Sequence, residues 1–207
     1  PGGAEPASVP VQAVSGGTIQ GFQIYQSVLT SLTAVLVYLL GRRYHPRVGL
    51  IAGMLYALYP SNIVMAQVFT NQHFAAFFAL LAILAFLAGA RAGRFGGSML
   101  FGALAGLLLL VSEYAHSSSL VTQIALILYT VTLCADFGKS RGRVLTALCM
   151  LAVCLVTLYG ARDVINRTLL SQGYRWASTP RYSYLEYVYT GLGYEHDGQL
   201  VPSERIA

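Results

Sequence analysis

Long apolar stretches separated by short polar or basic segments run along this chain, which is typical of a protein that crosses a membrane several times. Asp, Glu, Lys and Arg are absent from residues 6–41, 48–90, 114–135 and 144–161. Each stretch can cross the hydrocarbon core of a bilayer, which needs about 20 apolar residues. The pattern predicts six helical spans, over about residues 18–40, 48–60 and a little beyond, 71–90, 98–112 and a little beyond, 119–135 and 144–160.

The longest charge-free stretch predicts a helical hairpin. It runs for 43 residues, from Val48 to Ala90, which is about twice the length that one span needs. Pro60 opens a Pro-Ser-Asn segment, and Asn71 lies in a second polar segment, Thr-Asn-Gln. Such clusters mark turns, so we expect the chain to reverse direction in a loop over residues 61–70.

Composition places the chain in one structural class. Hydrophobic residues make up 56% of it and charged residues 10%, against about 25% charged residues in an ordinary soluble domain. The mean hydropathy is +0.60. These values exclude a soluble globular, collagen-like, disordered or disulfide-scaffold chain. The predicted fold class is all-α, a polytopic transmembrane helical bundle of about six spans with a Tyr-rich extracytoplasmic C-terminal segment.

Basic residues gather in three alternate loops and set the predicted orientation. These loops hold Arg42, Arg43, Arg47, Arg91, Arg94, Lys139, Arg141 and Arg143, whereas the other two short loops hold no Lys or Arg. Because cytoplasmic loops are enriched in Lys and Arg, we expect the basic loops in the cytoplasm and both ends of the chain outside it, at a bacterial plasma membrane. The net charge of +5 then follows from topology, and no basic face remains for a nucleic acid.

The ends of the chain predict two extracytoplasmic segments around the membrane domain. The expected organisation is an N-terminal segment over residues 1–17, the six-span domain over 18–160, and a tail over 161–207 that begins an outer loop or domain. The tail is rich in Tyr, a residue that favours the membrane surface. Pro1 stands where a start Met would, so we expect an internal piece of a longer membrane protein.

Polar side chains gather at the predicted outer ends of the spans, while the span centres carry no ionisable residue. Ion-coupled transporters need such residues inside the membrane, so the pattern argues against that class. A polar group at one membrane face favours a site for a lipid-borne substrate. The candidate residues are Asn71, Gln72, His73, Glu113, Tyr114, His116 and Arg162, followed in the tail by Arg175 and Arg181.

Glu113 is the candidate of greatest interest. A helix that starts near Ser98 places it about 22 Å along a core about 30 Å thick, so we expect it to be partly buried. His116 follows on the same helix face, and the two residues could serve in proton transfer or hold a divalent metal. The alternative is that Glu113 only caps its span at the surface. His73 and Asn71 have a similar alternative, a polar start to the third span.

The arginines after the last span allow two interpretations. A guanidinium just outside the membrane can satisfy the oxygens of a lipid phosphate, which favours Arg162, Arg175 and Arg181 as substrate contacts. The alternative is contact with lipid headgroups.

Small residues within the spans predict close helix packing. The pairs Gly49/Gly53 and Gly102/Gly106 have the GxxxG spacing that lets backbones approach each other. The three cysteines lack CxxC spacing and are interpreted as small apolar packing residues.

Three segments resemble a known family. GRRYHPRVGLIAGMLYALYPSNIV, FTNQHFAAFFALLAILAFLAG with SMLFGALAGLLLLVSEYAH, and YVYTGLGYEHDGQLVPSE are similar in outline to segments of the polytopic GT-C glycosyltransferases. That class includes protein O-mannosyltransferases and lipid A aminoarabinose transferases. The resemblance covers most of the chain at the level of pattern. Asn71 and Gln72 stand where related enzymes often have Asp or Glu, and Glu113 stands where they often have a basic residue.

The resemblance implies a membrane enzyme that moves a sugar from a polyprenyl-phosphate-linked donor to a lipid, glycan or protein acceptor at the extracytoplasmic face. The family's catalytic acidic residue lies in a first outer loop that precedes this chain, so the resemblance implies no catalytic residue here beyond the candidates Glu113 and His116. The resemblance implies no definite cofactor, and a divalent metal could serve the reaction. Two alternatives stay open: a carrier or flippase for lipid-linked sugars, and a structural subunit.

Overall fold

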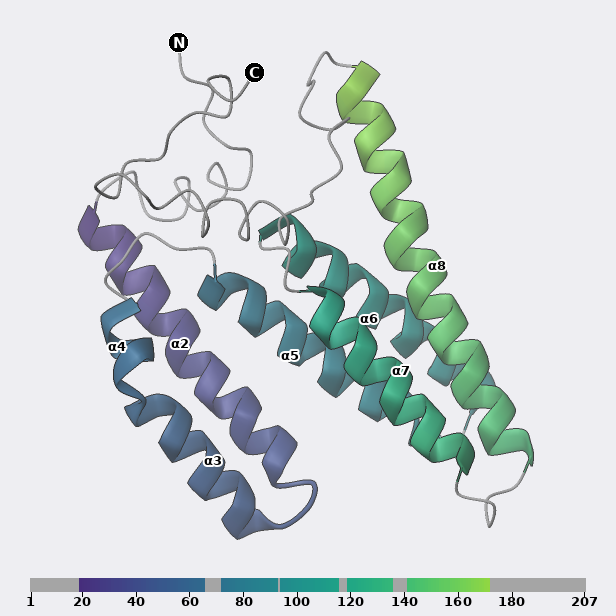
Figure 1. Ribbon diagram of the computed structural model, residues 1–207, viewed down its shortest axis with the longest axis horizontal. Helices are drawn as coiled ribbons and strands as arrows, with labels where there is room; N and C mark the ends of the chain where they lie inside the picture. The colour runs from purple at the N-terminus through teal and green to yellow at the C-terminus, as the bar shows by residue number, and fades with distance from the viewer. Residues whose placement is uncertain (1–18, 66–71, 93, 116–118, 136–140, 172–207) are drawn as a thin grey trace, which may run out of the picture. The chain divides into compact units, whose positions relative to one another are not determined.

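The protein is described from a computed structural model, which describes residues 19–65, 72–92, 94–115, 119–135 and 141–171. Within these ranges all regular structure is α-helical and no strand is present, which confirms the predicted all-α class. The helices, drawn in Figure 1, are α2 (Ile19–Gly41), α3 (Pro46–Leu58), α4 (Pro60–Met65), α5 (Gln72–Gly89), α6 (Phe95–Ala115), α7 (Ser119–Ala135) and α8 (Arg141–Ser171).

Four of these helices are long and apolar enough to cross a membrane, namely α2, α5, α6 and α8. Helix α3 with 13 residues and α7 with 17 residues are apolar but shorter. The sequence predicted a span at each of these six places. The last helix continues for 11 residues past Gly160, where the sequence predicted the span to end.

The α3 boundaries follow from local sequence. His45 is the N-cap in an extended conformation, its Nδ1 accepts from the Arg47 amide at 3.2 Å, and Pro46 occupies the first turn. Tyr59 ends the helix with ψ of 119°, the conformation favoured before a proline. The predicted loop over residues 61–70 was wrong for its first half, because Pro60 starts a second short helix, α4.

Helices α2 and α3 pack closely through glycines and run side by side in Figure 1. A Cβ at Gly49 would lie 2.6 Å from the carbonyl oxygen of Tyr38, and one at Gly53 would lie 3.1 Å from Tyr38 Cβ. The first separation is one that real Cβ atoms do not show, so a larger residue at Gly49 would force the backbones apart. The first predicted GxxxG pair is therefore a packing feature.

Helices α5, α6, α7 and α8 share one apolar core. It contains Ala82, Phe86, Ala105, Leu109, Leu110, Leu126, Met150, Cys154 and Leu158. Gly102 and Gly106 of α6 lie against the α8 backbone: a Cβ at Gly102 would be 2.7 Å from Met150 O, and a Cβ at Gly106 would collide with Cys154 O. The second GxxxG pair thus joins α6 to α8, and buried Cys154 is a packing residue as predicted.

Large apolar side chains cover the outer surface of the helices. On α3 alone, Ile51, Leu55 and Leu58 are all more than half exposed. In water such a surface would be unfavourable, whereas in a bilayer it meets lipid chains of the same polarity. The chain divides after Val164 into two units, and the contacts described below lie within the first.

Candidate functional site at one end of the bundle

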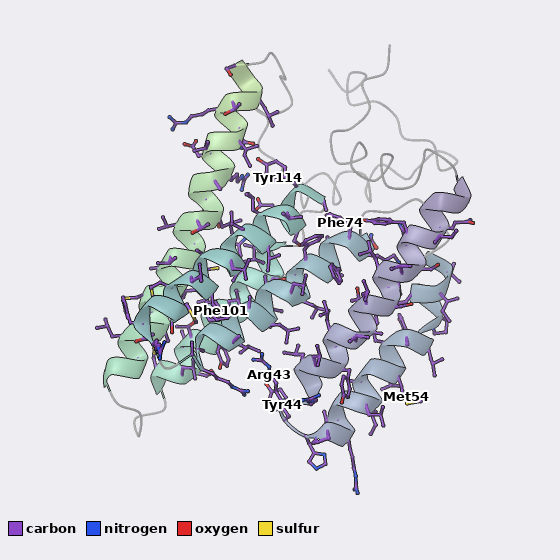
Figure 2. The ribbon with its side chains drawn as sticks, turned by 180° about the vertical axis from the view of Figure 1, so that it is seen from behind. Arg43, Tyr44, Met54, Phe74, Phe101 and Tyr114 are labelled. Atoms are coloured by element: carbon purple, nitrogen blue, oxygen red, sulfur yellow. The ribbon has the colours of Figure 1, made fainter. Side chains whose placement is uncertain are left out.

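Antiparallel packing brings three helix ends together. The start of α5, the end of α6 and the start of α7 lie at the same end of the bundle, and α8 runs back towards it. Figure 2 shows Phe74 and Tyr114 at this end, with Arg43 and Tyr44 at the opposite one. We call the first the polar end and the second the basic end.

An ion pair joins two helices at the polar end. Arg162 Nη1 of α8 donates to Glu113 Oε1 in the last turn of α6 at 2.6 Å. The side chain of Glu113 is 17% exposed and that of Arg162 is 35% exposed. Glu113 is therefore partly buried, as the sequence predicted, and does more than cap its helix.

The start of α5 is fastened next to the same place. Ser112, which precedes Glu113, donates its buried hydroxyl to Ala75 O at 2.9 Å. Ala75 lies two residues after His73, whose side chain is 6% exposed. The bond thus holds the beginning of α5 against the end of α6, and it keeps His73 and Glu113 at one level of the bundle.

A third polar contact links α7 to α8. Tyr159 OH donates to Gln123 Oε1 at 2.7 Å, and Gln123 is buried. Gln123 lies one turn inside α7, and Tyr159 lies about one turn before Arg162 on α8. The polar residues of four helices therefore converge at one end of the bundle.

The predicted site residues differ in where the structure places them. Glu113 and Arg162 are in contact at the polar end, and His73 lies at the same end on α5. Gln72 is exposed at the first position of α5, and Tyr114 is half-buried against the core. The remaining candidates, Asn71, His116, Arg175 and Arg181, lie outside the described residues.

Sequence reasoning missed three residues of this polar end. Ser112, Gln123 and Tyr159 were treated as ordinary residues of apolar spans, although each makes a side-chain hydrogen bond between helices. Gln123 carried a signal, because an amide inside an apolar helix must find a partner. Ser112 and Tyr159 gave no comparable signal.

Among the described residues, no group of three His, Cys, Asp or Glu side chains is placed to hold a metal ion. At the polar end the Glu113 carboxylate and the Arg162 guanidinium are in contact, and the buried His73 imidazole lies at the same end. This set can bind phosphate through the cation, form hydrogen bonds to a sugar, and accept a proton.

Comparison with known proteins identifies a family. Residues 15–196 match the family described as "Predicted membrane protein (DUF2079)". The chain belongs to this family. No curated protein and no solved structure matches the chain. Membership in the DUF2079 family, together with four long apolar helices, establishes a multi-pass membrane protein.

Proposed function

We propose that this member of the DUF2079 family is an integral membrane glycosyltransferase of the GT-C type. In this proposal it moves a sugar from a polyprenyl-phosphate-linked donor to a lipid, glycan or protein acceptor at the extracytoplasmic face of a bacterial plasma membrane. The observation that supports it best is the Glu113–Arg162 pair, set between helices at the end of the bundle that lacks the basic loops.

Each member of the pair has chemistry that the reaction needs. Sugar transfer to a hydroxyl requires a group that takes up its proton, and it requires cations that stabilise the departing lipid phosphate. A guanidinium has five N–H donors, and Arg162 uses Nη1 for Glu113 within the described part of the chain. Its other donors can meet phosphate oxygens at the partly exposed side of the residue.

The neighbouring residues complete the proposed substrate site. His73, with Asn71 and Gln72 before it, would form hydrogen bonds to sugar or phosphate, and Tyr114 would contact the substrate beside them. From outside the described residues we propose His116 beside Glu113, and Arg175 or Arg181 near the phosphate. Within this chain, Glu113 and His116 would act as supporting groups or as the base itself.

Turnover of labelled donors tests this proposal. The full protein is placed in nanodiscs with radiolabelled polyprenyl-phosphate sugars, and release or transfer of the sugar is followed. Glu113→Gln keeps the side-chain size, whereas Arg162→Gln shortens the side chain. Each removes one charge, so both are expected to reduce turnover at least about tenfold. Arg94→Gln removes a charge from the exposed basic end and serves as the matched control.

The alternatives predict different results. A carrier or flippase would move the intact labelled lipid across the bilayer without cleavage, and a structural subunit would neither cleave nor move it. Because the ion-pair variants also lose stability, their turnover is compared with that of Ser112→Ala, which loses a buried bond near the same place but no charge. Equal losses in all three variants would contradict a catalytic or binding role for the pair.

A further inference from the structure

Two arginines of the basic end stand on tight turns that belong to different parts of the chain. The turn between α2 and α3 is closed by backbone bonds from Arg43 N to Leu40 O at 3.2 Å and from Tyr44 N to Gly41 O at 3.0 Å. The turn after α5 is closed by a bond from Arg91 N to Ala88 O at 3.1 Å. Both arginines are thus carried on ordered backbone.

Arg43 reaches across to α5. Its Nη2 donates to Leu84 O at 3.4 Å, and its Nη1 is buried and makes no hydrogen bond to any described residue. Leu84 lies five residues before the last residue of α5, or about 7 Å along the helix. The guanidinium therefore lies beside the last turns of α5, inside the end of the helix and not beyond it.

The surroundings of Arg43 are cationic. Burial and the nearby charge of Arg91 lower the pKa of Arg43, while Tyr129 of α7 raises it. The two carboxylates among the described residues, Glu113 and Asp163, both lie at the polar end, away from Arg43. A buried guanidinium donor beside a second arginine is costly unless an anion satisfies it.

We propose that Arg43 and Arg91 bind the phosphate of an anionic phospholipid headgroup between the α2–α3 turn and the end of α5. The buried Nη1 of Arg43 would donate to a phosphate oxygen, and Arg91 would contribute the second charge. Basic pockets between helices on one side of a membrane are suited to acidic headgroups. This site lies at the other end of the bundle from the proposed sugar-transfer site and does not depend on it.

Lipid preference of the full chain tests the proposal. The protein is reconstituted in nanodiscs of phosphatidylcholine with or without phosphatidylglycerol, and bound lipid is counted by native mass spectrometry after release. Retention of phosphatidylglycerol is expected to fall at least about tenfold in Arg43→Gln and Arg91→Gln. Arg47→Gln and Arg94→Gln, which remove exposed charges from the same end, are expected to retain it.

Further arms make the outcome decisive. Arg43→Lys is the second variant in case Arg43→Gln does not fold. It keeps the charge but not the fork of donors, and it is expected to retain less phosphatidylglycerol than the native protein. Inorganic phosphate added to the phosphatidylglycerol nanodiscs reports whether the site binds the free ion. If phosphate displaces phosphatidylglycerol at equal concentration, the lipid site is overturned. Equal losses of phosphatidylglycerol in all four Gln variants would indicate a diffuse effect of charge and would overturn the site. If the native protein shows no preference for phosphatidylglycerol and Asp136→Asn does, Asp136 is the anion that satisfies Arg43, and the proposal fails.

Discussion

Glu113 Oε1 and Arg162 Nη1 lie 2.6 Å apart although 49 positions separate the two residues in the chain. Both side chains are partly buried, and each belongs to a helix whose remaining surface is mostly apolar. The pair therefore joins α6 to α8 by charge at the same end where Ser112 joins α6 to α5 by a hydrogen bond.

Loss of either charge of this pair should destabilise the fold. Glu113→Gln or Arg162→Gln leaves the other charge uncompensated in a partly desolvated place, and we expect each to cost about 1–2 kcal/mol after allowance for solvent screening. Unfolding in mixed detergent micelles measures the cost. The double variant should lose less than the sum of the two single losses. Strictly additive losses would show that the two side chains do not interact.

Packing of α6 against α8 should tolerate no side chain at Gly106. A Cβ there collides with the carbonyl oxygen of Cys154, which is backbone and cannot move aside alone. Gly106→Ala is expected to lower the free energy of unfolding by about 1–3 kcal/mol. Gly160→Ala on α8 is the control, because nothing lies within 4 Å of its Cβ position. It should raise stability by about 0.5–1 kcal/mol, so equal effects of both substitutions would contradict the packing.

The hydroxyl of Ser112 should matter more than that of an exposed serine. Ser112→Ala removes a buried bond between two helices and is expected to cost about 1 kcal/mol. Ser27 donates to Gln23 O of its own helix at 2.8 Å and is exposed, so Ser27→Ala should be nearly neutral. The same micelle unfolding assay compares the two variants, and a larger loss in Ser27→Ala would refute the assignment.

Orientation in the membrane is tested by labelling from one side. Tyr44 at the basic end is 85% exposed, and Ser61 of α4 is exposed near the other end of α3. In a variant without native cysteines, Ser61→Cys should react with an impermeant maleimide on intact cells, and Tyr44→Cys only after the membrane is opened. The reverse pattern would place the proposed sugar-transfer site in the cytoplasm.

Sequence alone determined that this protein is a bundle of membrane-crossing helices. Charge-free stretches of sufficient length predict helices in a bilayer because only helices and closed barrels satisfy their backbone there. The same stretches located all six apolar segments, and the small-residue spacing located both glycine contacts. Helix ends were less well predicted: α8 runs past Gly160 into polar sequence, because hydropathy does not report helical hydrogen bonds beyond the apolar stretch.

Tertiary structure decided which polar residues meet. Glu113, His73 and Arg162 could be placed at one face from the sequence, but the partner of Glu113 depends on α8 packing against α6 through Gly102 and Gly106. Likewise, the sequence identifies Arg43 only as one cation of a basic loop, and its hydrogen bond to Leu84 O follows from the packing of α2 against α5. Periodicity and charge describe each helix separately, whereas contacts between distant helices follow from the shapes of their packed surfaces.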